Sequence, residues 1–169
     1  MSDDGTLSMR PLGLFDLELA AAIHGACFEV PWDARTFAEL MAMPGAAGVC
    51  ALADSEPAGL ILFLLQGPDA EILTLGVLPK LRRRGIGHAL LAAAADRARE
   101  TGAARLLLEV AADNPVATSL YRRAGFQPLA RRPRYYRRAA GPAVDADVLV
   151  LELRTGALPE PASPGDAGK

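Results

Sequence analysis

The chain has 169 residues, 51% hydrophobic and 22% charged, with a formal net charge of −2 at pH 7. These values suit one globular domain with its own core and argue against a surface built throughout for nucleic acid. Cys27 and Cys50 are too few for a disulfide framework, no apolar run reaches the roughly 18 residues of a membrane span, and the acidic N-terminus does not resemble a signal peptide, so we expect a cytoplasmic protein with reduced thiols and no membrane contact.

The predicted elements begin, after a frayed segment over residues 1–5, with a strand over residues 6–12 and two short helices. Asp16 is placed to cap a helix that runs to about Phe28, and Asp33 is placed to cap one that ends near Ala42. Strands over residues 48–53, 59–66 and 70–78 follow. The turns between them are short and contain Gly, Pro or Asp, so these strands are predicted to form an antiparallel meander.

The second half alternates helices and strands. A long helix is predicted from Gly85 to about Thr101, with one stripe formed by Ile86, Ala89, Leu90, Ala93, Ala94 and Arg97. The apolar run over residues 105–111 predicts a central strand, and Asn114-Pro115 starts a helix that ends at Gly125. A strand from Phe126, a basic loop over residues 131–138 and a last strand over residues 147–153 complete a mixed, mostly antiparallel α/β sheet with helices on its faces.

Domain limits follow from the same patterns. We expect residues 6–154 to form the domain. Residues 155–169 hold three prolines and three glycines with little to bury, which predicts a disordered tail.

The most informative segment is the turn between the strand ending at Val77-Leu78 and the helix beginning at Gly85. The first N–H groups of a helix lack intrahelical partners, the macrodipole is positive there, and glycines let an anion approach. The arginines of Arg82-Arg83-Arg84 add positive charge. The pattern indicates a pyrophosphate site, or else a tight turn with a solvated arginine run. Dinucleotide and nucleoside-triphosphate fingerprints both fail on spacing, because Leu90 stands where a third glycine would be needed and no Gly-Lys-Ser/Thr run is present.

Arg82-Arg83-Arg84-Gly85-Ile86-Gly87 fits the signature [QR]-x-x-G-x-[GA] and resembles the GCN5-related N-acetyltransferase (GNAT) superfamily, over about residues 7–153. Within it the chain looks most like the RimI family, which acetylates the N-terminus of a ribosomal protein. The stretches that carry this second resemblance are Cys27–Trp32, Leu108–Asn114, Leu120–Phe126, Arg132–Tyr136 and Asp145-Ala146. Val144, in place of a glutamate, and the lost arginine and serine of an E-V-R-x-S-N run depart from the RimI pattern on the acceptor side.

The resemblance implies acetyl-CoA as co-substrate and no metal. Its pantetheine arm would lie between the strand ending at Val77 and the strand over residues 105–111, where backbone N–H groups polarise the thioester carbonyl. Asn114, a predicted helix cap, would also hold this arm. The cofactor-binding residues are then Val77, Leu78, Arg82, Arg83, Arg84, Gly85, Ile86, Gly87, His88 and Asn114.

Two residues are candidates for the chemistry. Glu109 interrupts an apolar strand and is the candidate general base; the alternative is a carboxylate at an exposed strand end, paired with an arginine. Tyr121, two helical turns after Asn114, is the candidate general acid; the alternative is a half-buried helix tyrosine. The RimI resemblance favours the catalytic roles, and we expect direct transfer without an acetyl-cysteine.

The acceptor side is less determined. Trp32, Tyr135 and Tyr136 are candidates to line a cleft for a peptide end, and packing is an equal role for each and the favoured one for Trp32. The acceptor is predicted to be a protein or peptide N-terminus, as of a ribosomal protein. Alternatives are acetylation of a small amine, a non-catalytic acyl-CoA-binding module and, least favoured, an RNA- or ribosome-binding domain; direct contact with nucleic acid is not expected.

Overall fold

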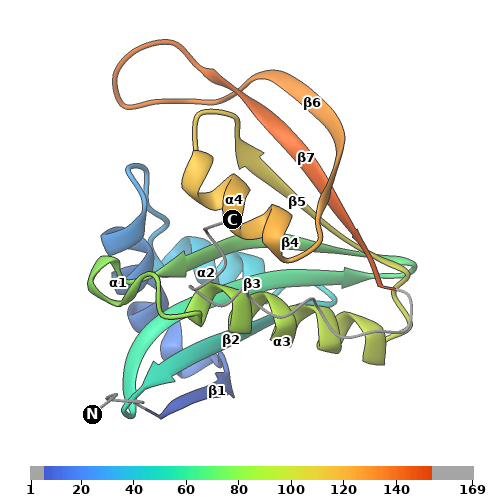
Figure 1. Ribbon diagram of the computed structural model, residues 1–169. Helices are drawn as coiled ribbons and strands as arrows, with labels where there is room; N and C mark the ends of the chain where they lie inside the picture. The colour runs from blue at the N-terminus through green and yellow to red at the C-terminus, as the bar shows by residue number, and fades with distance from the viewer. Residues whose placement is uncertain (1–5, 154–169) are drawn as a thin grey trace, which may run out of the picture.

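The computed structural model describes residues 6–153, which form one seven-stranded sheet in the order β1-β2-β3-β4-β5-β7-β6 (Figure 1). Neighbouring strands are antiparallel except β4 and β5, as the mixed, mostly antiparallel prediction requires. The strands are β1 (Leu7–Pro11), β2 (Ala46–Ala53), β3 (Glu56–Gln66), β4 (Asp69–Val77), β5 (Arg105–Ala111), β6 (Gln127–Tyr136) and β7 (Val144–Glu152). The predicted frayed end and C-terminal tail lie outside the described residues.

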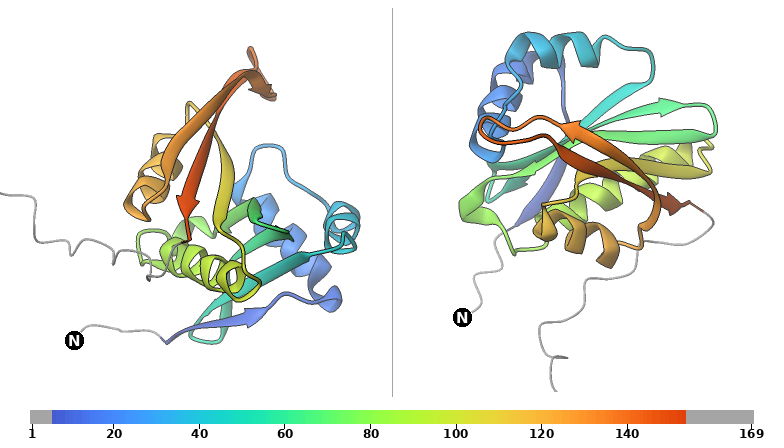
Figure 2. Two further views of the ribbon diagram at one scale, coloured as in Figure 1. Left: turned by 90° about the vertical axis from the view of Figure 1, so that its right-hand side faces the viewer. Right: turned by 90° about the horizontal axis from the view of Figure 1, so that it is seen from above.

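Four helices cover the two faces of the sheet (Figure 2). They are α1 (Leu17–Cys27), α2 (Ala34–Met41), α3 (Ile86–Glu100) and α4 (Pro115–Arg123), with 3-10 turns η1 (Leu14–Asp16) and η2 (Pro79–Leu81). Phe37 and Ile23 pack with one face of β3, and Leu90, Leu91 and Phe126 pack with the other. No helix in the described part of the chain is long and apolar enough to span a membrane.

The helix starts show how local signals decide the elements. The Asp33 carboxylate accepts the Thr36 N–H at 2.8 Å and caps α2, as predicted. Asp16 makes no such bond to α1. Its carboxylate instead accepts the Gly13 N–H at 2.7 Å and pairs with Arg10 at 2.8 Å, which closes η1 before the helix begins.

The buried stripe of α3 is shifted from the predicted one. Arg97 is exposed and pairs with Glu100 at 2.8 Å, and Ala89 and Ala93 are half-buried. The buried residues are Ile86, Leu90, Leu91, Ala94, Ala95 and Ala98. Many alanines permit two neighbouring stripes, and Leu91 selects the one that the sheet covers.

The predicted basic loop over residues 131–138 is wrong for most of its length. Residues 127–136 form β6, which pairs with β7 at the edge of the sheet. Nearly every residue of this strand is exposed, so its sequence carries no apolar alternation. Irregularities between Pro128 and Ala130 and between Arg132 and Tyr136, the latter including Pro133, interrupt the pairing, as is common at an unprotected edge.

Candidate active site

The parallel strands β4 and β5 separate halfway along their length. Only residues Asp69–Ile72 of β4 pair with β5, where their partners are Arg105–Leu108. Beyond these pairs β4 continues to Val77 and β5 to Ala111. A bulge in β4 causes the change. Phe63 of β3 pairs with Ile72 and Leu62 pairs with Thr74, so Leu73 has no partner on β3. Beyond this point each strand has backbone groups that the other does not bind.

Val77 turns its backbone groups toward this separation. The Leu78 N–H donates to the Ala58 carbonyl at 2.9 Å, so Leu78 bonds to β3. Because backbone groups alternate along a strand, those of Val77 point to the opposite edge. Its carbonyl accepts the Cys27 thiol at 3.3 Å and Arg82 Nε at 3.1 Å. The Val77 N–H therefore faces the region between β4 and β5.

The start of α3 lies beside the end of β4. Its first backbone hydrogen bond runs from the Ala89 N–H to the Gly85 carbonyl at 3.0 Å. The N–H groups of Ile86, Gly87 and His88 therefore have no acceptor within the helix. Gly85 has φ +76°, in the left-handed region. A side chain at Gly87 would meet Leu120 of α4 at 3.0 Å, which explains the second glycine.

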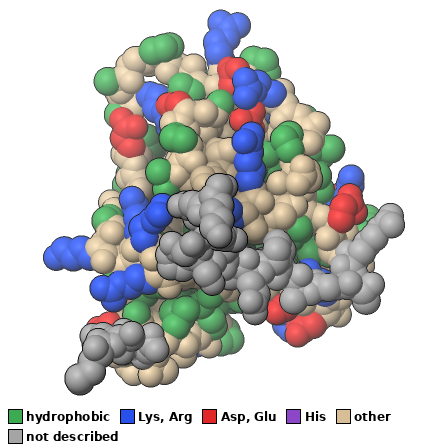
Figure 3. Space-filling model, viewed as in Figure 1, with side chains coloured by type: hydrophobic (Ala, Val, Ile, Leu, Met, Phe, Trp, Pro, Cys, Tyr) green, Lys and Arg blue, Asp and Glu red, His purple; other side chains and the backbone are tan. Residues whose placement is uncertain are grey.

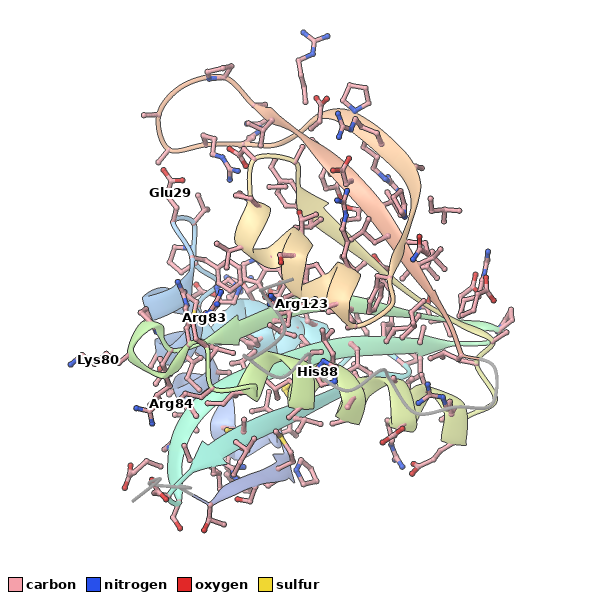
Figure 4. The ribbon with its side chains drawn as sticks, viewed as in Figure 1. Glu29, Lys80, Arg83, Arg84, His88 and Arg123 are labelled. Atoms are coloured by element: carbon pink, nitrogen blue, oxygen red, sulfur yellow. The ribbon has the colours of Figure 1, made fainter. Side chains whose placement is uncertain are left out.

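Basic side chains surround this helix start. Arg82, Arg83 and Arg84 are exposed, and Figure 3 shows Lys and Arg side chains gathered over this side of the molecule. Figure 4 shows Lys80 in the turn before α3 and His88 on the first turn of α3. Lys80 was not among the predicted site residues.

Glu109 lies on the face of β5 opposite the α3–α4 core. Its side chain is 16% exposed and its Oε1 pairs with Arg132 Nε at 2.8 Å, so the arginine partner that the sequence left open is present. The Tyr136 hydroxyl donates to the Glu109 carbonyl at 3.1 Å. Hydrogen bonding to the Glu109 carboxylate raises the pKa of the Tyr135 phenol. The β6–β7 hairpin thus brings Tyr135 and Tyr136 to Glu109.

Tyr121 of α4 lies in the buried core on the other face of β5 from Glu109. It is 8% exposed, more buried than predicted, and its ring packs edge-on against Phe126 at 5.9 Å. Burial, with a contribution from nearby Tyr136, raises the pKa of its phenol, so the hydroxyl stays protonated.

A cavity of about 310 Å³ opens beside Glu109 on this face of the sheet. Its charged lining residues are Asp69, Glu71, Glu109 and Arg132. A second groove, of about 450 Å³, lies between α4 and the β6–β7 hairpin and includes Arg122, Arg123 and Arg131. Neither Glu109 nor Tyr121 lines that groove.

Known proteins share this arrangement of sheet and helices. Residues 17–126 match the Acetyltransferase (GNAT) family. The chain belongs to this family. It is accordingly an acyltransferase of the N-acetyltransferase type, as the signature at Arg82–Gly87 predicted.

Three relatives of this GNAT enzyme indicate its position in the family. The [ribosomal protein bS18]-alanine N-acetyltransferase of Salmonella typhimurium is 31% identical over 147 residues, which are 84% of this chain and 95% of that protein. The crystal structure of the ribosomal-protein-S18-alanine N-acetyltransferase from Escherichia coli has a TM-score of 0.82 and 27% identity, and covers 90% of this chain and 97% of that one. The mycothiol acetyltransferase of Clavibacter sepedonicus is 44% identical over 85 residues, 50% of this chain and 28% of that protein.

Two further predicted site residues of the GNAT enzyme have clear structural roles. Asn114 is exposed and its side chain accepts the Ala117 N–H at 3.1 Å, which caps α4. Trp32 stacks on His24 with ring centroids 4.8 Å apart and packs edge-on against Phe37. Within residues 6–153, no aromatic contact joins Trp32 to Tyr135 or Tyr136, so packing is the role that the fold gives it.

Three arginines of the predicted basic loop over residues 131–138 form ion pairs with carboxylates. Arg131 pairs with Asp147 at 2.7 Å, Arg132 with Glu109, and Arg138 with Asp113. These pairs hold the hairpin to β5 and β7 and neutralise much of its charge.

His24 fixes the segment that leads to Trp32. Its Nδ1 accepts the Trp32 N–H at 3.0 Å, and its Nε2 lies 3.2 Å from the Thr74 hydroxyl. Because Nδ1 is an acceptor, the proton sits on Nε2 and the ring is neutral. Burial between Phe28 and Trp32 lowers the pKa of His24 to about 4.

Because His24 is buried in its neutral form, we expect the free energy of unfolding to fall in mild acid. The unfolded chain protonates at its ordinary pKa near ~6.5, so stability is lost as the pH falls from there toward 4. Between pH 7 and 4.5 we expect His24 to remove about 2–3 kcal/mol from the free energy of unfolding, measured by urea titration. His24→Gln should flatten this dependence, and His88→Gln should preserve it; equal slopes in wild type and His24→Gln would contradict the assignment.

Proposed function

We propose that this enzyme transfers the acetyl group of acetyl-CoA to the N-terminal α-amine of a protein or peptide, such as a ribosomal protein. The observation that carries the proposal is the separation of β4 and β5, with the Val77 N–H on one side, Glu109 on the other and the start of α3 beside it. The 31% identity to an enzyme named for ribosomal protein bS18 supports the acceptor class.

The residues present suit acetyl-CoA, which supplies an acetyl group activated as a thioester. The free N–H groups of Ile86, Gly87 and His88 suit its linked phosphates, with Arg83 and Arg84 as nearby charge. On binding, Arg82 would give up its hydrogen bond to the Val77 carbonyl and donate to a phosphate oxygen instead. The unpaired edges of β4 and β5 suit its amide groups, and Asn114, Val77 and Leu78 flank that path.

The chemistry is direct transfer between amine and thioester. Glu109 takes a proton from the acceptor ammonium, directly or through water, and the amine nitrogen forms a bond to the carbonyl carbon. The Val77 N–H stabilises charge on the carbonyl oxygen, and the nitrogen releases its second proton to solvent so that a neutral amide forms. The carbon–sulfur bond breaks, and Tyr121 gives its proton to the leaving sulfur. Tyr121 suits this role because its raised pKa keeps the proton in place until the thiolate forms.

An acceptor panel tests this proposal. Purified enzyme with acetyl-CoA is expected to acetylate the α-amine of peptides with N-terminal alanine, detected by mass spectrometry with fragment ions that locate the acetyl group. Peptides with a blocked N-terminus and an internal lysine serve as the control and should react far more slowly. Acetylation of the lysine side chain alone would overturn the acceptor assignment.

A second candidate is a small amine as acceptor. It is favoured by the 44% identity, over half of the chain, to a mycothiol acetyltransferase. The same panel includes amino acids, polyamines and amino sugars. Faster turnover of any of these than of every peptide would favour this candidate.

A further inference from the structure

A second carboxylate shares the cavity beside Glu109. Glu71 of β4 pairs with Leu107 of β5, and Leu107 and Glu109 point to the same face because they are two residues apart. Glu71 and Glu109 both line the 310 Å³ cavity. One strand spacing across and two residues along place their Cα atoms about 8 Å apart.

The charges in this cavity do not balance within the described chain. Asp69 pairs with Arg105 at 2.8 Å, and Glu109 pairs with Arg132 at 2.8 Å. Glu71 has neither an ion pair nor a side-chain hydrogen bond to any residue in the range 6–153. Burial and the charge of Glu109 raise the pKa of Glu71, and the charge of Arg132, which is paired with Glu109, offsets this only in part.

The reacting amine does not supply the missing charge. It must be neutral when it attacks the thioester, because an ammonium nitrogen has no free electron pair. At that moment Glu71 still carries its charge and remains accessible to solvent. A second positive charge on the acceptor, held about 8 Å from the amine, would balance it.

We propose that Glu71 determines specificity for acceptors that carry a second cationic group about 8 Å from the reacting amine. The inference rests on the proposed function and names a substrate class for it. Two sources have this chemistry: an arginine or lysine near a peptide N-terminus, and the second ammonium of a polyamine.

The test compares acceptors that differ only in this charge. One pair of peptides has N-terminal alanine followed by arginine or by citrulline, its neutral isostere. The other pair is spermidine and butylamine. We expect wild-type kcat/KM to favour the charged member of at least one pair by about five-fold or more, and the preference to shrink with added salt. The pair that shows the preference identifies the source.

The variants separate specificity from structure. Glu71→Gln should bring the ratio within the preferred pair close to one, whereas Glu56→Gln, an exposed carboxylate at the start of β3, should keep the wild-type ratio. Acetylation without any charge preference, or Glu71→Gln slowing both members equally, would overturn the inference while the proposed function stands. Absence of acetylation of every acceptor would instead overturn the proposed function.

Discussion

Glu109→Gln is expected to lower kcat/KM at pH 7 by about 10²- to 10⁴-fold, the range of a lost general base. The amide has nearly the same shape and still accepts a hydrogen bond from Arg132, but it cannot take a proton. Because Arg132 is 59% exposed, the pair contributes at most about 1 kcal/mol to stability and the variant should fold. Steady-state kinetics with an N-terminal peptide, at saturating acetyl-CoA, measure the effect.

The pH dependence makes this test specific. The pKa of an α-amine is near ~8, so at pH 9.5 most of the acceptor is already neutral and needs no base. The deficit of Glu109→Gln should therefore shrink as the pH rises. The raised pKa of Tyr121 keeps the proposed acid intact over that range. Glu56→Gln is the matched control, and a constant deficit at all pH values would assign Glu109 a purely structural role.

Gly85→Asp is expected to weaken acetyl-CoA binding by about 100-fold or more, equivalent to about 2.7 kcal/mol. Gly85 is the N-cap of α3, with φ +76° and no atom within 4 Å of an added Cβ. Aspartate tolerates a left-handed backbone and caps helices well, so the fold should survive. Its carboxylate would accept hydrogen bonds from the N–H groups that are proposed to bind the phosphates, and its negative charge would repel those phosphates.

The other end of the same helix offers a control. Gly102 also has a left-handed backbone, with φ +81° and open space around an added Cβ. Gly102→Asp is expected to cost a few tenths of a kcal/mol or more in stability, since a negative charge at a helix C-terminus opposes the macrodipole, and to leave acetyl-CoA affinity unchanged. Equal weakening by both variants would show that the effect is not local to the helix start.

Local signals account for the parts of the fold that were predicted well. β5 and the caps at Asp33 and Asn114 follow from residues within a few positions of each other. The proposed phosphate-binding turn could be recognised for the same reason, because its glycines and arginines are consecutive; its role stays a prediction. The start of β6 was predicted as a strand, but its second half was predicted as a loop, because an edge strand exposed on both sides needs no apolar alternation.

The composition of the cleft was less predictable, because it depends on contacts between distant segments. Arg132 of β6 meets Glu109 of β5 only because β7 pairs with both strands, so that the arginine side chain reaches across β7. Glu71 shares a face with Glu109 through a parallel register that no local pattern reveals. The bulge at Leu73 ends that register, and no sequence pattern predicts it either.

Calorimetric titration of acetyl-CoA into the wild-type protein tests the central claim most directly. The structure predicts saturable binding of one acetyl-CoA per chain, competed by coenzyme A and lost in Gly85→Asp but not in Gly102→Asp. Absence of binding by folded wild-type protein, or binding that Gly85→Asp leaves intact, would contradict the assignment of the start of α3 as the phosphate site.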